Sequence, residues 1–141
     1  MAPLISTIEI ARPPEEVFAY ATDPSRFAEW QHDVVRVRLL DNGQFTTSRR
    51  IRGAERTMSQ QITVNDPPHR WAAQGIDGPI RPHATIAVEP IENGTRSRVT
   101  FTLDFEGHGL GVPLVPLVRR QARHEAPTSY QNLKQLLESN R

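Results

Sequence analysis

The stretch IEIARPPEEVFAYATDPSRFAEW, residues 8–30, reads as a short alternating strand followed by two helix starts. Its PPEE segment (residues 13–16) suits the first turn of a helix, because a proline there loses no hydrogen bond and glutamates complement the positive end of the helix dipole. Asp23 and the proline after it repeat this signal as a cap and a first helical residue. We therefore expect one strand and two short helices, the second ending near Trp30.

After this opening the apolar residues recur with a period of two, which is typical of strands. Val35, Val37 and Leu39 alternate with arginines, and the DNG segment at residues 41–43 predicts a hairpin turn. The last alternating run is the clearest and predicts a half-buried antiparallel strand. Further strands are predicted over residues 45–52, 56–65, 69–76, 85–89 and 96–106.

Beyond a glycine-rich loop at residues 107–113, the pattern becomes helical. One helical face collects apolar or small residues at steps of three and four. These residues are Val115, Val118, Ala122, Ala126, Tyr130, Leu133 and Leu137. Pro127 lies inside this run and removes a backbone hydrogen bond, so we expect the helix to kink or split there.

The composition narrows the function classes. The chain has 141 residues, a formal net charge of +1 and no cysteine. This charge argues against a dedicated nucleic-acid binder, and the lack of cysteine excludes disulfides and thiolate chemistry. No apolar run approaches the roughly 20 residues that cross a membrane, and the N-terminus lacks a signal-peptide pattern. We expect a single cytoplasmic domain over residues 1–141, without stable membrane insertion.

The chain resembles a known superfamily in three stretches: RPPEEVFAYATDPSRFAEW (residues 12–30), GTRSRVTFTLDFEG (94–107) and YQNLKQLLE (130–138). It resembles the START-like (SRPBCC) superfamily, specifically its polyketide cyclase/dehydrase and lipid-transport branch. The resemblance covers essentially the whole chain. It implies an α+β helix-grip fold, in which a curved antiparallel sheet of about seven strands wraps around a long C-terminal helix.

The resemblance also implies a function. Members bind small hydrophobic or amphipathic molecules such as lipids, polyketides or quinones in an internal cavity, so we expect binding or carriage of such a ligand. One alternative is a polyketide aromatase/cyclase or dehydratase acting in the same cavity, although no catalytic motif of the branch carries over. Another is a regulatory protein-interaction module. We expect no cofactor and no nucleic-acid partner, and the sequence allows a homodimer.

Strand parity places Arg49 and Gln60 on the inner face of the sheet. A buried polar group needs a partner, and in a cavity that partner could be a polar atom of the ligand. For Arg49 the alternative is a strand-end side chain that reaches water. Arg119 and Arg123 on the final helix either rim an entrance or form a solvated basic turn.

Aromatic and small residues complete the predicted ligand site. Trp71 offers a flat wall for stacking, although core packing is its commoner role, and Trp30 is expected to plug the space between the second helix and the sheet. Phe101 and Tyr130 face the same interior. Ala122 and Ala126 leave space opposite the curved sheet. The predicted ligand-binding residues are Arg49, Gln60, Trp71, Phe101, Ala122, Ala126 and Tyr130.

The remaining motifs give little support to other chemistry. No histidine stands in a compact metal-ligand spacing, and Glu106 with His108 makes only a weak pair, so we expect no metal site. His83 is placed on the outer side of its strand. No GxSxG elbow or phosphate-binding loop occurs. On the inner face of the strands we find no carboxylate or histidine. Because proton transfer needs a positioned acid or base, we rank the enzyme hypothesis below ligand binding.

Overall fold

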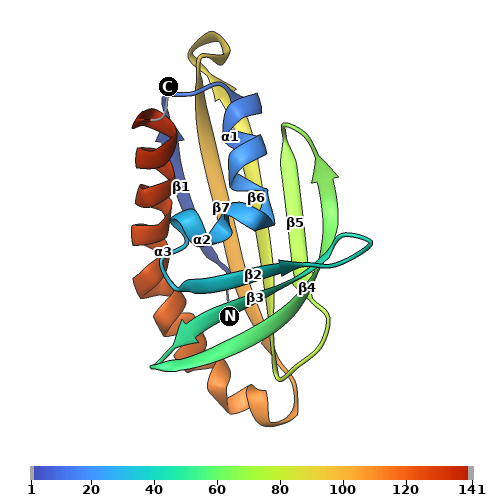
Figure 1. Ribbon diagram of the computed structural model, residues 1–141. Coiled ribbons are helices and arrows are strands. Elements are labelled where there is room, and N and C mark those ends of the chain that lie inside the picture. Colours follow the sequence, from blue (N-terminus) through green and yellow to red (C-terminus); the bar gives the residue numbers. More distant parts are fainter. Residues whose placement is uncertain (1, 140–141) are drawn as a thin grey trace.

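The computed structural model of the chain describes residues 2–139. Its elements occur in an order that matches the expected one (Figure 1). They are β1 (Leu4–Ile10), α1 (Pro14–Ala21), the 3-10 turn η1 (Pro24–Arg26), α2 (Phe27–Trp30), β2 (Val34–Leu39), β3 (Gln44–Ile51), β4 (Ala54–Asp66), β5 (Arg70–Gly75), β6 (Ile80–Ile91), the 3-10 turn η2 (Glu92–Gly94), β7 (Arg96–Gly107), the 3-10 turn η3 (Gly109–Leu114) and α3 (Val115–Ser139). The single domain over residues 1–141 stays a prediction, and residues 1, 140 and 141 lie outside the described part.

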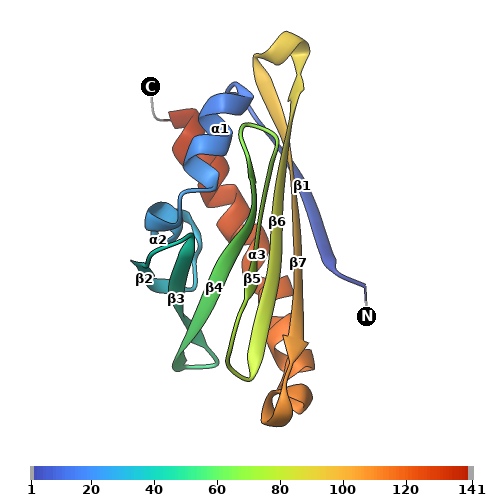
Figure 2. The ribbon, with the colours of Figure 1, turned by 90° about the vertical axis from the view of Figure 1, so that its right-hand side faces the viewer.

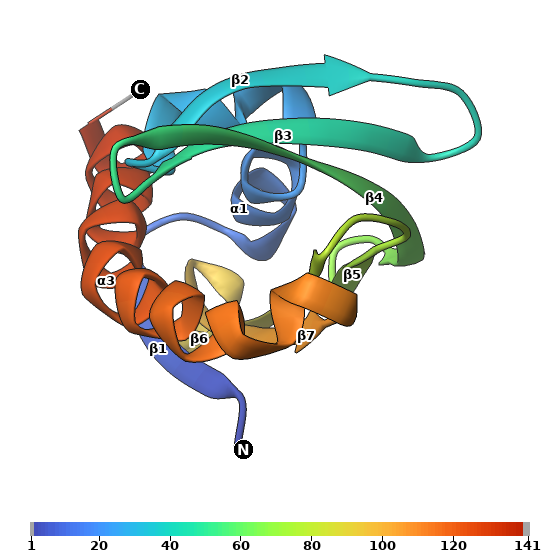
Figure 3. The same ribbon diagram turned by 90° about the horizontal axis from the view of Figure 1, so that it is seen from below.

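Within residues 2–139 the strands form one seven-stranded antiparallel sheet in the order β1-β7-β6-β5-β4-β3-β2. The sheet curves strongly, so that β2 and β3 face β6 and β7 across the interior, and α3 runs along the open side (Figure 3). From the side, α1 and α2 lie with α3 on the concave face of the sheet (Figure 2). This arrangement confirms the predicted α+β helix-grip fold.

The two short helices begin where the sequence predicts. Pro14 occupies the first turn of α1, whose buried face carries Val17, Phe18 and Ala21. Asp23 caps the next turn by accepting a hydrogen bond from the Ser25 amide at 3.0 Å. The apolar residues of both helices reach the core, where each fully buried large side chain contributes about 1.5–3 kcal/mol.

The C-terminal helix differs from the expectation at Pro127. Helix α3 continues from Val115 to Ser139 without a break, so the predicted split is wrong. Pro127 has no N–H to donate to the Arg123 carbonyl. Both residues lie on the exposed side of the helix. Water can therefore satisfy the freed carbonyl, and the helix tolerates the missing hydrogen bond.

Strand β2 is irregular at its start, and one further expectation needs correction. The register of β2 against β3 shifts between Val34 and Arg36, and Val34 is buried while Val35 is 39% exposed. After this bulge Val37 again packs against the core. Arg119 is neither solvated nor at an entrance: it is buried and donates to the Asp104 carboxylate and the Ala2 carbonyl.

Candidate functional site

A cavity lies between the inner face of the sheet and α3, and its volume is about 110 Å³. Residues from β3 to β7, α2, the α2–β2 loop and α3 line it. Its apolar wall comprises Phe27, Trp30, Ile51, Met58, Trp71, Pro82, Ala84, Ile86, Phe101, Leu103, Phe105, Val118, Ala122, Ala126 and Tyr130. A drug-sized ligand usually occupies about 300–1,000 Å³, whereas a cavity of about 150 Å³ can hold benzene. The space therefore suits a single ring or a short chain.

All seven residues predicted to bind a ligand line this one cavity. They come from four strands and from three successive turns of α3, which lie far apart in the sequence. The alternation of the strands and the helical spacing of α3 were sufficient to place them together. Whether they contact a ligand stays a prediction.

The aromatic side chains of the wall pack against one another around Phe27. Its ring makes edge-to-face contacts with the rings of Trp30, Phe45 and Trp71 at centroid distances of 6.0, 5.9 and 5.9 Å. Trp30 and Trp71 are both buried, so they pack in the core and also line the cavity. The Trp30 indole nitrogen has no hydrogen-bond partner among the described residues.

Tyr130 lies flat on Phe101, with ring centroids 3.9 Å apart and an interplanar angle of 11°. Burial raises the pKa of Tyr130 to about 12, although the nearby positive charge of Arg49 acts in the opposite direction. The hydroxyl makes no hydrogen bond to any other described residue. Tyr130 therefore presents a protonated hydroxyl at the cavity wall.

Gln60 is buried, as strand parity predicts, and projects from β4 into the cavity wall. Its amide oxygen accepts a hydrogen bond from the Thr47 hydroxyl on the neighbouring strand at 2.9 Å. Within residues 2–139 its amide nitrogen has no partner. One end of the Gln60 amide is thus held by the sheet, and the other is available for a ligand.

Arg49 lies on the inner face but finds partners in the chain itself. One terminal nitrogen (Nη1) donates to Asp33 Oδ1 at 3.0 Å, and the other (Nη2) donates to Gln31 Oε1 at 2.6 Å. Both partners belong to the α2–β2 loop. Arg49 therefore has protein partners rather than a wholly solvated guanidinium, and its contact with a ligand stays a prediction.

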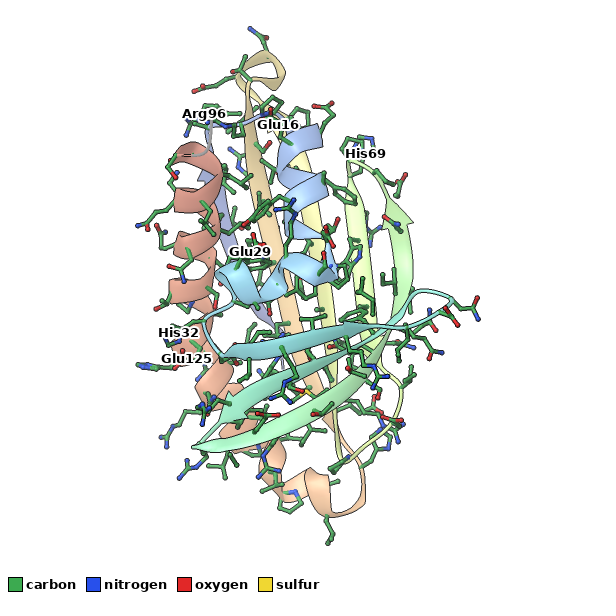
Figure 4. The ribbon with its side chains drawn as sticks, viewed as in Figure 1. Glu16, Glu29, His32, His69, Arg96 and Glu125 are labelled. Atoms are coloured by element: carbon green, nitrogen blue, oxygen red, sulfur yellow. The ribbon has the colours of Figure 1, made fainter. Side chains whose placement is uncertain are left out.

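Two carboxylates line the cavity, and neither comes from a strand, where the sequence predicts none on the inner face. Asp33 stands in the loop before β2, and Glu125 projects from α3 beside Ala126. Glu125 pairs with His32, and the two side chains meet at the flank of α3 (Figure 4). Strand parity could not find either carboxylate because neither residue lies on a strand.

Hydrogen bonds to α3 hold the α2–β2 loop in place. The His32 amide donates to Ser129 Oγ at 2.8 Å, and Asn132 Nδ2 donates to the Trp30 carbonyl at 3.3 Å. These contacts fix the loop that carries Asp33. The orientation of Arg49 therefore depends on α3 as well as on its own strand.

Gln121 joins α3 to the tip of the β3–β4 hairpin beside the cavity. Its amide nitrogen donates to the Arg50 carbonyl at 2.8 Å, and its amide oxygen accepts from the Arg52 amide at 3.0 Å. Gln121 and Ile51, which lies within this tip, both line the cavity. The hairpin tip thus closes against the helix through one side chain.

The pair Glu106 and His108, considered for metal binding, lies outside the cavity. Glu106 pairs with His108 and also with His83, whose Nε2 atom is 3.4 Å from the carboxylate. The His108 hydrogen bond is the main cause that lowers the pKa of Glu106. His83 stays on the outer side of β6, as predicted. Among the described residues no group of three or more potential metal ligands occurs.

Residues 1–138 match the family model described as polyketide cyclase / dehydrase and lipid transport. Toxin Rv0910 of Mycobacterium tuberculosis (strain ATCC 25618 / H37Rv) is 30% identical over 139 residues, which cover 94% of this chain and 95% of that protein. Among solved structures, the Zhui aromatase/cyclase from Streptomyces sp. R1128 has a TM-score of 0.81 at 12% identity and covers 96% of this chain and 93% of its own. A START superfamily protein from Mycobacterium smegmatis has a TM-score of 0.79 at 16% identity, with 99% of both chains covered.

Within residues 2–139 no helix combines the length and the apolar character needed to span a bilayer.

Proposed function

This chain belongs to the polyketide cyclase / dehydrase and lipid transport family, and we propose that its cavity binds a small hydrophobic or amphipathic molecule. The observation that carries the proposal is a mostly apolar cavity whose wall includes polar side-chain groups without partners among the described residues. These groups include the Gln60 amide nitrogen, the Tyr130 hydroxyl and the Trp30 indole nitrogen. Such a combination is typical of ligand sites, where apolar area provides affinity and a few polar groups provide orientation.

Six of the seven predicted residues have a role in this proposal. Trp71 and the stacked pair of Phe101 and Tyr130 form flat walls. Ala122 and Ala126 on α3 keep the opposite side open, because a larger side chain at either position would enter the cavity. Gln60 holds the polar end of the ligand.

The two tryptophans allow ligand binding to be measured at the cavity wall itself. The chain contains only Trp30 and Trp71 as tryptophans, and both line the cavity. Their two indole N–H resonances in a ¹H–¹⁵N spectrum therefore report on the cavity wall. Titration with acetophenone, a single-ring aromatic ketone, should shift both resonances in a saturable manner.

Substitution of Ala126 by Phe fills the cavity and should abolish the acetophenone response. The matched control is Ala28→Phe, because Ala28 is exposed on α2 and does not line the cavity. Saturable shifts that survive in Ala126→Phe would contradict binding at this site.

A second candidate function is that of an aromatase/cyclase or dehydratase, and the carboxylates of the wall favour it. Asp33 and Glu125 line the cavity, and His32 pairs with Glu125. These groups supply the acids and bases that ring closure and water loss require. Incubation with a linear poly-ketone chain, followed by mass spectrometry, would reveal loss of water. Asp33→Asn and Glu125→Gln should remove that activity if either group transfers the proton.

The Mycobacterium tuberculosis relative is named a toxin. A third candidate function of this chain is therefore growth inhibition. The 30% identity over nearly the whole chain is the supporting observation. Induced expression of this chain in a bacterial host, compared with the Ala126→Phe variant, tests it. Arrest by the wild type alone would link inhibition to the cavity, and normal growth in both cultures would remove this candidate.

A further inference from the structure

We infer that the ligand is an uncharged molecule with a carbonyl-type hydrogen-bond acceptor, and that organic anions are excluded. This inference rests on the proposed ligand-binding function and specifies its chemical class. It follows from three properties of the cavity, namely the charges in its wall, the polar groups left without partners and its volume.

The first property is the charge of the wall. Three charged residues line the cavity within the described chain: Arg49, Asp33 and Glu125. Asp33 pairs with Arg49 through a 3.0 Å contact, so the single positive charge is already neutralised. Glu125 adds a second negative charge, which His32 offsets only when protonated. The wall is therefore neutral or negative, and an anion buried there would lack a compensating charge.

The second property is the chemistry of the unpartnered groups. The Gln60 amide nitrogen is a donor without an acceptor in the described chain. The Tyr130 hydroxyl also lacks a partner and keeps its proton, because burial raises its pKa to about 12. Both groups line the cavity, so a ligand that displaces water from them binds well only if it brings an acceptor. A carbonyl oxygen can accept a hydrogen bond from either group.

A cationic ligand fits less well than a neutral one. The guanidinium of Arg49 lies close enough to Tyr130 to influence its hydroxyl. Asp33 already pairs with that charge, so hydrogen bonding rather than repulsion disfavours a cation. The Gln60 amide nitrogen can only donate, and a protonated amine also donates, so it would leave this nitrogen unpaired.

The third property is size. The volume of about 110 Å³, below the roughly 150 Å³ that holds benzene, limits the enclosed part of the ligand to about one ring. Acetophenone and benzoate are suitable probes, because both have a benzene ring and a carbonyl. Acetophenone carries a methyl group where benzoate carries a charged oxygen. Their comparison isolates the effect of charge at nearly constant shape.

The experiment titrates both probes at neutral pH and follows the Trp30 and Trp71 indole resonances. We expect acetophenone to bind at least about tenfold more tightly than benzoate. Equal or tighter binding of benzoate would overturn the inference while supporting the proposed function. Failure of both probes would overturn the function and the inference together.

Asp33→Asn provides the matched variant, because it removes one negative charge with little change of shape and frees the charge of Arg49. The ratio of acetophenone to benzoate affinity should fall by about tenfold. Glu125→Gln removes the other negative charge without touching Arg49, and it serves if Asp33→Asn fails to fold. An unchanged ratio in the folded variants would show that the wall charges do not select the ligand, which overturns the inference.

Discussion

Arg49 and Asp33 face each other across the cavity wall, with Nη1 of the arginine 3.0 Å from Oδ1 of the aspartate. Their side chains are 23% and 16% exposed, so the pair is only partly in contact with water. Arg49 comes from β3, whereas Asp33 comes from the loop that α3 holds in place. The pair therefore links the sheet to the helix side of the cavity and cancels the positive charge of its wall.

The energy of this pair can be measured with a double-mutant cycle. Arg49→Met and Asp33→Asn should each lower the free energy of unfolding by about 1–2 kcal/mol, because each leaves the other charge partly buried. The double variant should recover about 1 kcal/mol of the summed loss. Urea denaturation of the four proteins gives the coupling, and additive losses would argue against a direct interaction.

Removal of the Tyr130 hydroxyl separates binding from stability. Tyr130→Phe keeps the ring on Phe101 and removes a partly buried hydroxyl that has no partner in the described chain. Stability should change by less than about 0.5 kcal/mol. Affinity for acetophenone should fall about fivefold, which corresponds to the loss of about 1 kcal/mol from one hydrogen bond. Unchanged affinity would show that the hydroxyl does not contact the ligand.

The raised tyrosine pKa values predict the behaviour of the protein in alkali. Burial raises the pKa of Tyr130 from 10.0 to about 12, and Tyr20 shifts to about 12 through burial and its hydrogen bond to Glu29. The folded state then holds protons that the unfolded chain releases, so this contribution is present below pH 10 and lost as the pH rises toward 12. Tyrosinate absorption should therefore appear at a higher pH in the folded protein than in the unfolded chain.

Tyr130→Phe is the control for this pH effect. It should weaken the decline of unfolding free energy between pH 10 and pH 12, leaving the smaller contribution of the more exposed Tyr20. A tyrosinate titration near pH 10 in the folded wild type would contradict the assignment.

The Gln121 contact predicts how the β3–β4 hairpin tip opens. Gln121→Ala removes the acceptor of the Arg52 amide, so hydrogen exchange at Arg52 should accelerate about tenfold. Dissociation of acetophenone should also accelerate, because the hairpin tip borders the cavity. Arg123→Ala is a suitable control, since Arg123 is exposed on the same helix and does not line the cavity.

The cavity positions were predictable where a regular period controls the direction of a side chain. Alternation placed Arg49, Gln60 and Phe101 on the inner face, and a helical step placed Tyr130 opposite them. A single slip of register would have reversed the strand positions. Such a shift occurs at the start of β2, between Val34 and Arg36.

The missed features depend on contacts between elements. Asp33 lies in a loop, where no period indicates direction, and Glu125 lies beside the predicted face of α3. Alternation places Asp104 on the opposite face of β7 from Phe101. Arg119 still pairs with it, because the start of α3 passes the edge of the sheet near Ala2. These contacts follow from the path of the chain in space, which local patterns do not determine.

The central claim, that the cavity holds a small molecule, is tested most directly by mass spectrometry of the organic extract from protein purified without detergent. The measurement compares the wild type with Ala126→Phe and with the surface control Ala28→Phe. We predict a stoichiometric, uncharged carbonyl compound in the wild type and in Ala28→Phe, and its loss from Ala126→Phe. The same compound at equal amounts in all three proteins, or none in the folded wild type together with no response to acetophenone, would contradict the account.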